Sequence, residues 1–155
     1  MRRWILIAAL VALADQLSKW AALHWLKPGE VVYVTRFFNW VLFFNEGASF
    51  SFLSNAGGWQ RWLFTALALA VSVWIVFQLR AHHTQRCLSL GFSLILGGAI
   101  GNVIDRIELG AVVDFVQWHV AGHYWPAFNV ADSAIVLGVV LILWDQFCIK
   151  KNTAT

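Results

Sequence analysis

Two aspartates, Asp114 and Asp132, lie close to the ends of long apolar stretches of this sequence. Carboxylates held a few ångströms apart cannot comfortably both ionise, so one keeps a proton while the other accepts one. The ionised member can take a proton from an attacking water, and the protonated member can hydrogen-bond the carbonyl oxygen of a peptide bond. General acid–base assistance of this kind contributes about 10²–10⁴-fold to a rate. Such a pair hydrolyses peptides without a nucleophilic serine or cysteine.

Other polar residues accompany these aspartates. Asp15 and Lys19 are four residues apart, so on a helix they share a face and can pair. Asn102 and Arg106 have the same spacing at the end of GGAIGNVIDR. The candidate site combines the aspartate pair with substrate-binding or supporting residues, which are Asp15, Lys19, Asn45, Asn102, Arg106 and Asn129.

The elements that carry these residues are predicted to be membrane spans. Of 155 residues, 60% are hydrophobic and 12% charged, whereas soluble domains have about half apolar and about a quarter charged residues. Ten tryptophans agree with a membrane protein, because indole rings favour the headgroup region. Four apolar runs, at about 4–26, 62–79, 88–107 and 131–149, are long enough to cross a bilayer. We expect one all-α polytopic domain over 1–155, with four transmembrane helices.

The basic residues orient these spans. They flank the first span, the loop between the second and third, and the end of the fourth, at Arg2, Arg3, Arg80, Arg86, Lys150 and Lys151. The positive-inside rule makes that side cytoplasmic, so both termini are expected inside and the loops at 27–61 and 108–130 outside. This topology brings every candidate site residue to the outer leaflet. Charges within a span cost at least about 2.5–3.5 kcal/mol each, so they usually pair or serve a site.

The first outer loop is predicted to hold a small strand-rich element. Its segments VVYVT and NWVLFF are rich in β-branched and aromatic residues, and turn residues bound them. We expect this element to lie on the membrane, with Trp40 at the interface.

Most of these features also have a structural interpretation. The pair of Asp15 and Lys19 could only lower the cost of insertion, and 105–108 could be a solvated helix end. FNVADS could be a helix start, with Asn129 as N-cap and Asp132 at the third position. Gly97 and Gly101 have a spacing that allows close helix packing.

Other functions stay open at this point. A small proton-coupled transporter also carries intramembrane charges, and a lipid-modifying enzyme would share the outer-leaflet site. Residues 1–14 have the pattern of a cleaved signal peptide, although the apolar run continues to Leu26. His119 and His123 could ligate a metal if their loop were helical, but no HExxH is present, and we predict no metal and no cofactor. The charge distribution gives no support for nucleic-acid binding.

Five motifs together resemble lipoprotein signal peptidases, the signal peptidase II family. They run in the same order across most of the chain: DQLSK at Asp15–Lys19, FFNEGASFSF at Phe43–Phe52, GGAIGNVIDR at Gly97–Arg106, VVDFV at Val112–Val116 and FNVADS at Phe128–Ser133. FNVADS together with GNVIDR and VVDF is highly specific.

The resemblance implies an aspartic endopeptidase of the bacterial inner membrane that removes signal peptides from prolipoproteins. Such enzymes cut before a cysteine that already carries a diacylglyceryl group. The family's catalytic dyad falls on Asp114 and Asp132, and its supporting residues on the six polar positions named above. We expect the enzyme to act as a monomer on lipidated prolipoproteins in the lipid bilayer. Because the N-terminus of a helix favours negative charge, we expect Asp132 to be the ionised member of the dyad.

Overall fold

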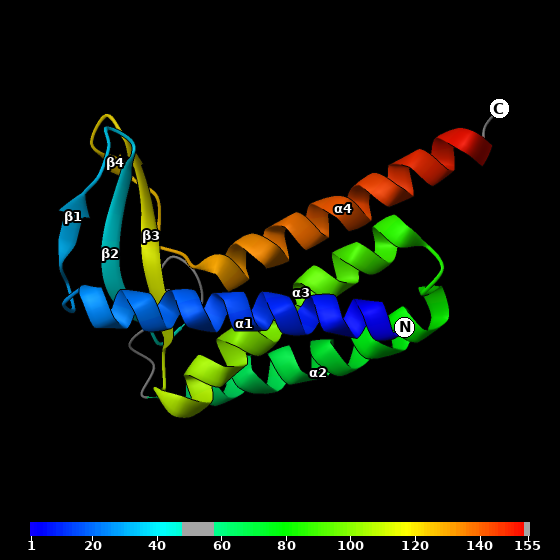
Figure 1. Ribbon diagram of the computed structural model, residues 1–155, viewed down its shortest axis with the longest axis horizontal. Helices are drawn as coiled ribbons and strands as arrows, with labels where there is room; N and C mark the ends of the chain where they lie inside the picture. Colours follow the sequence, from blue (N-terminus) through cyan, green and yellow to red (C-terminus); the bar gives the residue numbers. More distant parts are fainter. Residues whose placement is uncertain (48–57, 154–155) are drawn as a thin grey trace.

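A computed structural model describes residues 1–47 and 58–153 and contains four long helices within that part of the chain (Figure 1). They are α1 (Arg2–Trp25), α2 (Trp59–His82), α3 (Arg86–Glu108) and α4 (Val130–Thr153). All four are long and apolar enough to cross a membrane. The four predicted spans are therefore confirmed, and each helix extends a few residues past the predicted span at one or both ends.

Helix α3 is the central element, because α1, α2 and α4 all pack against it. Its glycines make this possible. A Cβ atom on Gly97 would collide with the main chain of α1 at Ala8, and one on Gly98 would collide with α4 at Ala131. The predicted close packing at the glycine motif is thus confirmed, and it brings the polar ends of α1, α3 and α4 together.

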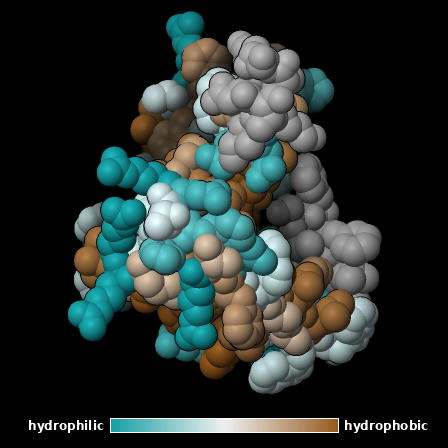
Figure 2. Space-filling view, turned by 90° about the vertical axis from the view of Figure 1, so that its right-hand side faces the viewer, coloured by the Kyte–Doolittle hydropathy of each residue, from teal (hydrophilic) through white to brown (hydrophobic). Residues whose placement is uncertain are grey.

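The outer surfaces of α1, α2 and α4 are apolar, with exposed leucine, valine, tryptophan and phenylalanine side chains along their lengths. Figure 2 shows the end of the molecule where both termini lie, and hydrophilic residues gather on that face. An apolar belt with a polar end is the pattern expected for helices that cross a bilayer.

A four-stranded antiparallel sheet lies at the opposite end of the molecule from the termini (Figure 1). Its strands follow the order β1 (Val31–Tyr33), β2 (Phe38–Asn45), β3 (Val112–Val120) and β4 (His123–Tyr124). The predicted strands in the first loop are confirmed, and the sheet also contains two strands that the sequence did not predict. β3 and β4 come from the segment between α3 and α4. Without β3, the inner edge of β2 would have no partner for its backbone groups.

The register between β2 and β3 positions part of the candidate site. Phe43 lies opposite Asp114 and Asn45 opposite Val112, so the end of β2 runs past the start of β3. The predicted motif at 43–52 is described only as far as Gly47, and its remainder lies outside the described residues.

Candidate active site

Asp114 lies in β3 and is almost fully buried, at 3% exposure. Its two carboxylate oxygens accept hydrogen bonds from different amides. Nδ2 of Asn129 donates to Oδ1 (2.7 Å), and Nδ2 of Asn45 donates to Oδ2 (3.2 Å). β3 thus supplies the carboxylate, while β2 and the residue before α4 orient it.

Asp132 lies in the first turn of α4 and is partly exposed. Its Oδ1 accepts a hydrogen bond from Nδ2 of Asn102 (2.9 Å), and its Oδ2 accepts one from the backbone N–H of Asn129 (3.3 Å). In return, the Asp132 backbone N–H donates to Oδ1 of Asn129 (2.9 Å). This reciprocal pair is a helix cap, so the structural interpretation of FNVADS is confirmed. The same cap holds the Asp132 carboxylate in place.

Asn129 connects the two aspartates through one side chain. Its Oδ1 accepts the N–H of Asp132, while its Nδ2 donates to the carboxylate of Asp114. The residue is fully buried, and Nδ2 also contacts the carbonyl oxygen of Val113 (3.2 Å). The α4 cap and the start of β3 are therefore fixed relative to each other by a single amide.

The electrostatic environment of Asp114 favours its protonated form. Burial raises the pKa of Asp114 from 3.8 to about 7, and the negative charge of Asp132 adds to the increase. The hydrogen bonds from Asn45 and Asn129 oppose this change without cancelling it. At neutral pH Asp114 can therefore still hold its proton, as a general acid must.

Beneath the two aspartates lies a buried ionic cluster centred on Lys19. The Lys19 ammonium contacts Asp15 (2.8 Å) and Asp105 (2.7 Å), and all three side chains are 0–3% exposed. The predicted pairing of Asp15 and Lys19 is confirmed. Lys19 also donates to Oδ1 of Asn102 (2.9 Å), so that the other end of this amide, Nδ2, faces Asp132. Lys19 thus sets the direction in which Asn102 donates.

The carboxylates of this cluster also fix the main chain beside each catalytic candidate. Oδ1 of Asp15 accepts the N–H of Ala131 (2.8 Å), the residue before Asp132. Oδ2 of Asp105 accepts the N–H of Val113 (3.0 Å), the residue before Asp114. One cluster therefore positions both backbone segments.

Arg106 lies at the polar end of α3, one turn beyond Asn102. Its guanidinium donates to the carbonyl oxygens of Asn102 (3.2 Å) and Gly47 (3.4 Å), and it lies over the ring of Phe64. Its Nε is buried and has no partner among the described residues. Arg106 is close enough for its charge to act on Asp132. It therefore lies beside Asp132.

The structure brings all eight predicted site residues into one connected region, and it adds two that were not predicted. Gln16 donates to Oδ1 of Asp105 (2.8 Å) and to the carbonyl oxygen of Gly101 (3.1 Å). For Asp105, the alternative of a solvated helix end is wrong, since this residue is 3% exposed and paired with Lys19. The sequence did contain a signal for Gln16, because it is a second polar residue next to Asp15 within an apolar run.

A metal site at His119 and His123 would require their loop to be helical, and the structure shows that it is not. His119 belongs to β3 and His123 to β4, with His119 opposite Tyr124 and Val120 opposite His123. The rings of His119 and Tyr124 stack. No cluster of three or more metal-ligating side chains occurs in the part of the chain that the structure describes.

Comparison with known proteins agrees with this architecture. Residues 7–148 match the family model of signal peptidase (SPase) II. The lipoprotein signal peptidase of Polynucleobacter necessarius subsp. necessarius (strain STIR1) is 52% identical over 144 residues, which cover 93% of this chain and 88% of that protein. The lipoprotein signal peptidase of Azoarcus sp. (strain BH72) is 52% identical over 98% of this chain and 86% of its own.

Solved structures show the same fold. One described as a bacterial membrane enzyme has a TM-score of 0.87 and 30% identity, covering 98% of this chain and 92% of its own. A second with the same description has a TM-score of 0.79 and 31% identity, covering 92% of this chain and 91% of its own. With a family model matched over nearly the whole chain and relatives at half identity, this protein belongs to the signal peptidase II family.

Proposed function

We propose that this protein is an aspartic endopeptidase that removes the signal peptide from prolipoproteins, cleaving before a diacylglyceryl-modified cysteine. Family membership supports the substrate, and four helices long and apolar enough to cross a membrane are suited to a lipidated one. The observation that carries the aspartic mechanism is the Asn129 amide, which ties Asp114 and Asp132 into one hydrogen-bonded unit.

In this mechanism the two aspartates have different roles. Asp132 accepts two hydrogen bonds at its carboxylate and lies at the positive end of the α4 dipole, so it serves as the ionised base. Asp114, with its raised pKa, serves as the protonated acid. Asp132 takes a proton from the attacking water. Asp114 hydrogen-bonds the scissile carbonyl oxygen while the water oxygen bonds to the carbonyl carbon. The C–N bond then breaks as Asp132 passes its proton to the departing nitrogen. Asp114 keeps its own proton, so the pair returns to its starting state.

The surrounding residues keep this geometry and contact the substrate. Asn102 and Asn129 orient the dyad through the contacts described above. Arg106 lies close to Asp132, and Asn45 lies at the partly exposed end of β2, so we assign both to contacts with substrate backbone or headgroup atoms. The Lys19 cluster acts on the dyad through Asn102 and does not touch the substrate.

We place the protein in the bacterial inner membrane, with both termini in the cytoplasm and the dyad at the outer face. The basic flanks of the spans support this orientation, because they lie at the end of the molecule that carries the termini. The sheet then lies at the outer membrane surface. Exposed aromatic side chains on it, including Trp40 and Trp118, are suited to the headgroup region. We expect the protein to act as a monomer.

The substrate class is tested with the protein purified in detergent. A prolipoprotein carrying the diacylglyceryl group is compared with the same chain lacking it, and the products are identified by mass spectrometry. We expect cleavage at the bond before the modified cysteine, only in the lipidated substrate, and without loss of activity in the presence of a chelator. Equal cleavage of the unlipidated chain, or cleavage at another bond, would contradict the proposed substrate.

A further inference from the structure

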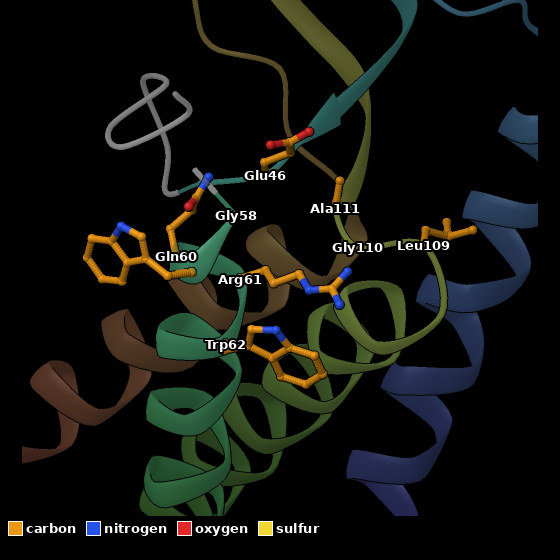
Figure 3. A pocket seen from close by; sticks show the side chains of 9 residues that line it. Glu46, Gly58, Gln60, Arg61, Trp62, Leu109, Gly110 and Ala111 are labelled. Carbon is orange, nitrogen blue, oxygen red and sulfur yellow. The ribbon is translucent and has the colours of Figure 1, made fainter. Parts of the chain in front are cut away.

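A cavity of about 570 Å³ opens between the start of α2, the end of β2 and the turn that follows α3 (Figure 3). None of the predicted site residues is among those that line it. Its charged residues are Arg61 and Glu46, and its aromatic ones are Trp59 and Trp62. The cavity and the aspartate site are therefore made of different residues, although both lie at the same end of the helices.

Arg61 presents a positive charge to this cavity. Its guanidinium stacks over the ring of Trp62, and it reaches so close to Gly110 that a Cβ atom there would lie 3.0 Å from its Nη1 (Figure 3). Glu46 also lines the cavity (Figure 3). The two do not pair with each other, and neither forms an ion pair with any other described residue. Two opposite charges thus remain available to a ligand.

The first turn of α2 adds unsatisfied polar groups. Gly58 is the N-cap and has no side chain that could cap the helix, and the first turn has no acidic residue. Gln60 is 0% exposed, and both Oε1 and Nε2 lack a partner among the described residues. Its side chain runs from α2 toward Gly58 along the cavity wall (Figure 3). Buried amides are nearly always hydrogen-bonded, so this one indicates a missing partner.

The position of the cavity indicates the chemistry of that partner. Trp59 and Trp62 are 52% and 58% exposed at the start of a membrane span, which is where indole rings meet lipid headgroups. Uncapped helix N-termini favour phosphate groups, as do basic pockets between membrane helices. A negative charge at Glu46 would repel a simple anion, but it would attract an ammonium group.

We propose that this cavity binds the zwitterionic headgroup of a phosphatidylethanolamine molecule of the bilayer. Its phosphate lies against Arg61 and the start of α2, and its ammonium lies against Glu46. The acyl chains leave past the tryptophans into the membrane. This site is independent of the proposed peptidase chemistry, because none of the residues that line it hydrogen-bonds Asp114 or Asp132.

Native mass spectrometry of the full chain in detergent micelles tests the proposal. The added lipids are phosphatidylethanolamine, phosphatidylglycerol and diacylglycerol. We expect phosphatidylethanolamine to bind most tightly and diacylglycerol, which has no phosphate, not to bind. Arg61→Gln should weaken phosphatidylethanolamine binding by about tenfold or more, because a charge-assisted contact is lost. Glu46→Gln, at an exposed position, should remove the preference for phosphatidylethanolamine over phosphatidylglycerol.

Arg80→Gln is the matched control, since Arg80 lies in the last turn of the same helix and stacks over Phe77. It should leave lipid binding unchanged. Inorganic phosphate at millimolar concentration should not displace the lipid. Equal loss in the two arginine variants, no lipid preference in the wild type, or full displacement by phosphate would each overturn the headgroup site. If Arg61→Gln fails to fold, the Glu46→Gln result alone decides, because unchanged lipid preference there refutes the assignment.

Discussion

Replacing Lys19 by methionine should strongly destabilise the protein. Lys19 is 2% exposed and contacts two carboxylates, Asp15 and Asp105, at 2.8 and 2.7 Å. Methionine fills a similar volume but leaves both carboxylates buried without a cation. Removing one partner of a buried ion pair typically costs about 3–5 kcal/mol. The free energy of unfolding should therefore fall by about that amount.

The measurement is equilibrium unfolding in mixed micelles, followed by circular dichroism. Lys27→Met is the matched control, because Lys27 is exposed just beyond α1, and it should change stability by less than about 0.5 kcal/mol. A double variant with Asp105→Asn removes one of the stranded charges. It should be more stable than the sum of the two single effects predicts, by about 0.5–3 kcal/mol.

The reasoning would be refuted if Lys19→Met were as stable as Lys27→Met. It would also fail if the two substitutions at Lys19 and Asp105 were simply additive. Either result would mean that the buried ion cluster contributes little to the free energy of unfolding.

Four further predictions concern the site and its packing. In the free enzyme, kcat/KM should fall as pH rises through about 7, when Asp114 loses its proton; a rate that stays constant up to pH 9 would contradict this. Because the pKa of Asp114 is raised on folding, its contribution to the free energy of unfolding should decrease from about pH 4 to about pH 7, and an Asp114→Asn variant should lack this decrease in urea or micelle unfolding. Gly98→Val should destabilise the protein by about 1–3 kcal/mol or more, because a Cβ atom would collide with the main chain at Ala131, and a thermal melt equal to wild type would disprove that contact. Asn129→Ala should lower the free energy of unfolding by roughly 0.5–2 kcal/mol, the cost of a lost helix cap. It should raise the activation free energy of cleavage by more than that, because the variant also loses the hydrogen bond to Asp114. Equal changes in the two free energies would mean that Asn129 acts only as a cap.

Local patterns in the sequence predicted the features that depend on neighbours along one helix. The four-residue spacing of Asp15 and Lys19 predicted their ion pair, and the order of residues in FNVADS predicted the cap of α4 by Asn129. The four spans followed from run length and composition, because a bilayer requires about 20 apolar residues per helix.

Contacts between distant segments could not be predicted in this way. The bond from Gln16 to Asp105 joins positions 89 apart, and it depends on how α1 crosses α3. Asp105 looked like a helix end in water because its burial is produced by that crossing and by Lys19. The pairing of β2 with β3 likewise depends on two loops meeting. The side-chain types along one segment do not show which distant segment it will contact.

The central claim is that Asp114 and Asp132 act together as the catalytic pair. The most direct measurement is cleavage of a diacylglyceryl-modified prolipoprotein by the wild type, Asp114→Asn and Asp132→Asn, with folding checked by circular dichroism. We expect each variant to remain folded and to lose cleavage by a factor of at least about 10². A folded variant of either aspartate that cleaves at the wild-type rate would contradict the account.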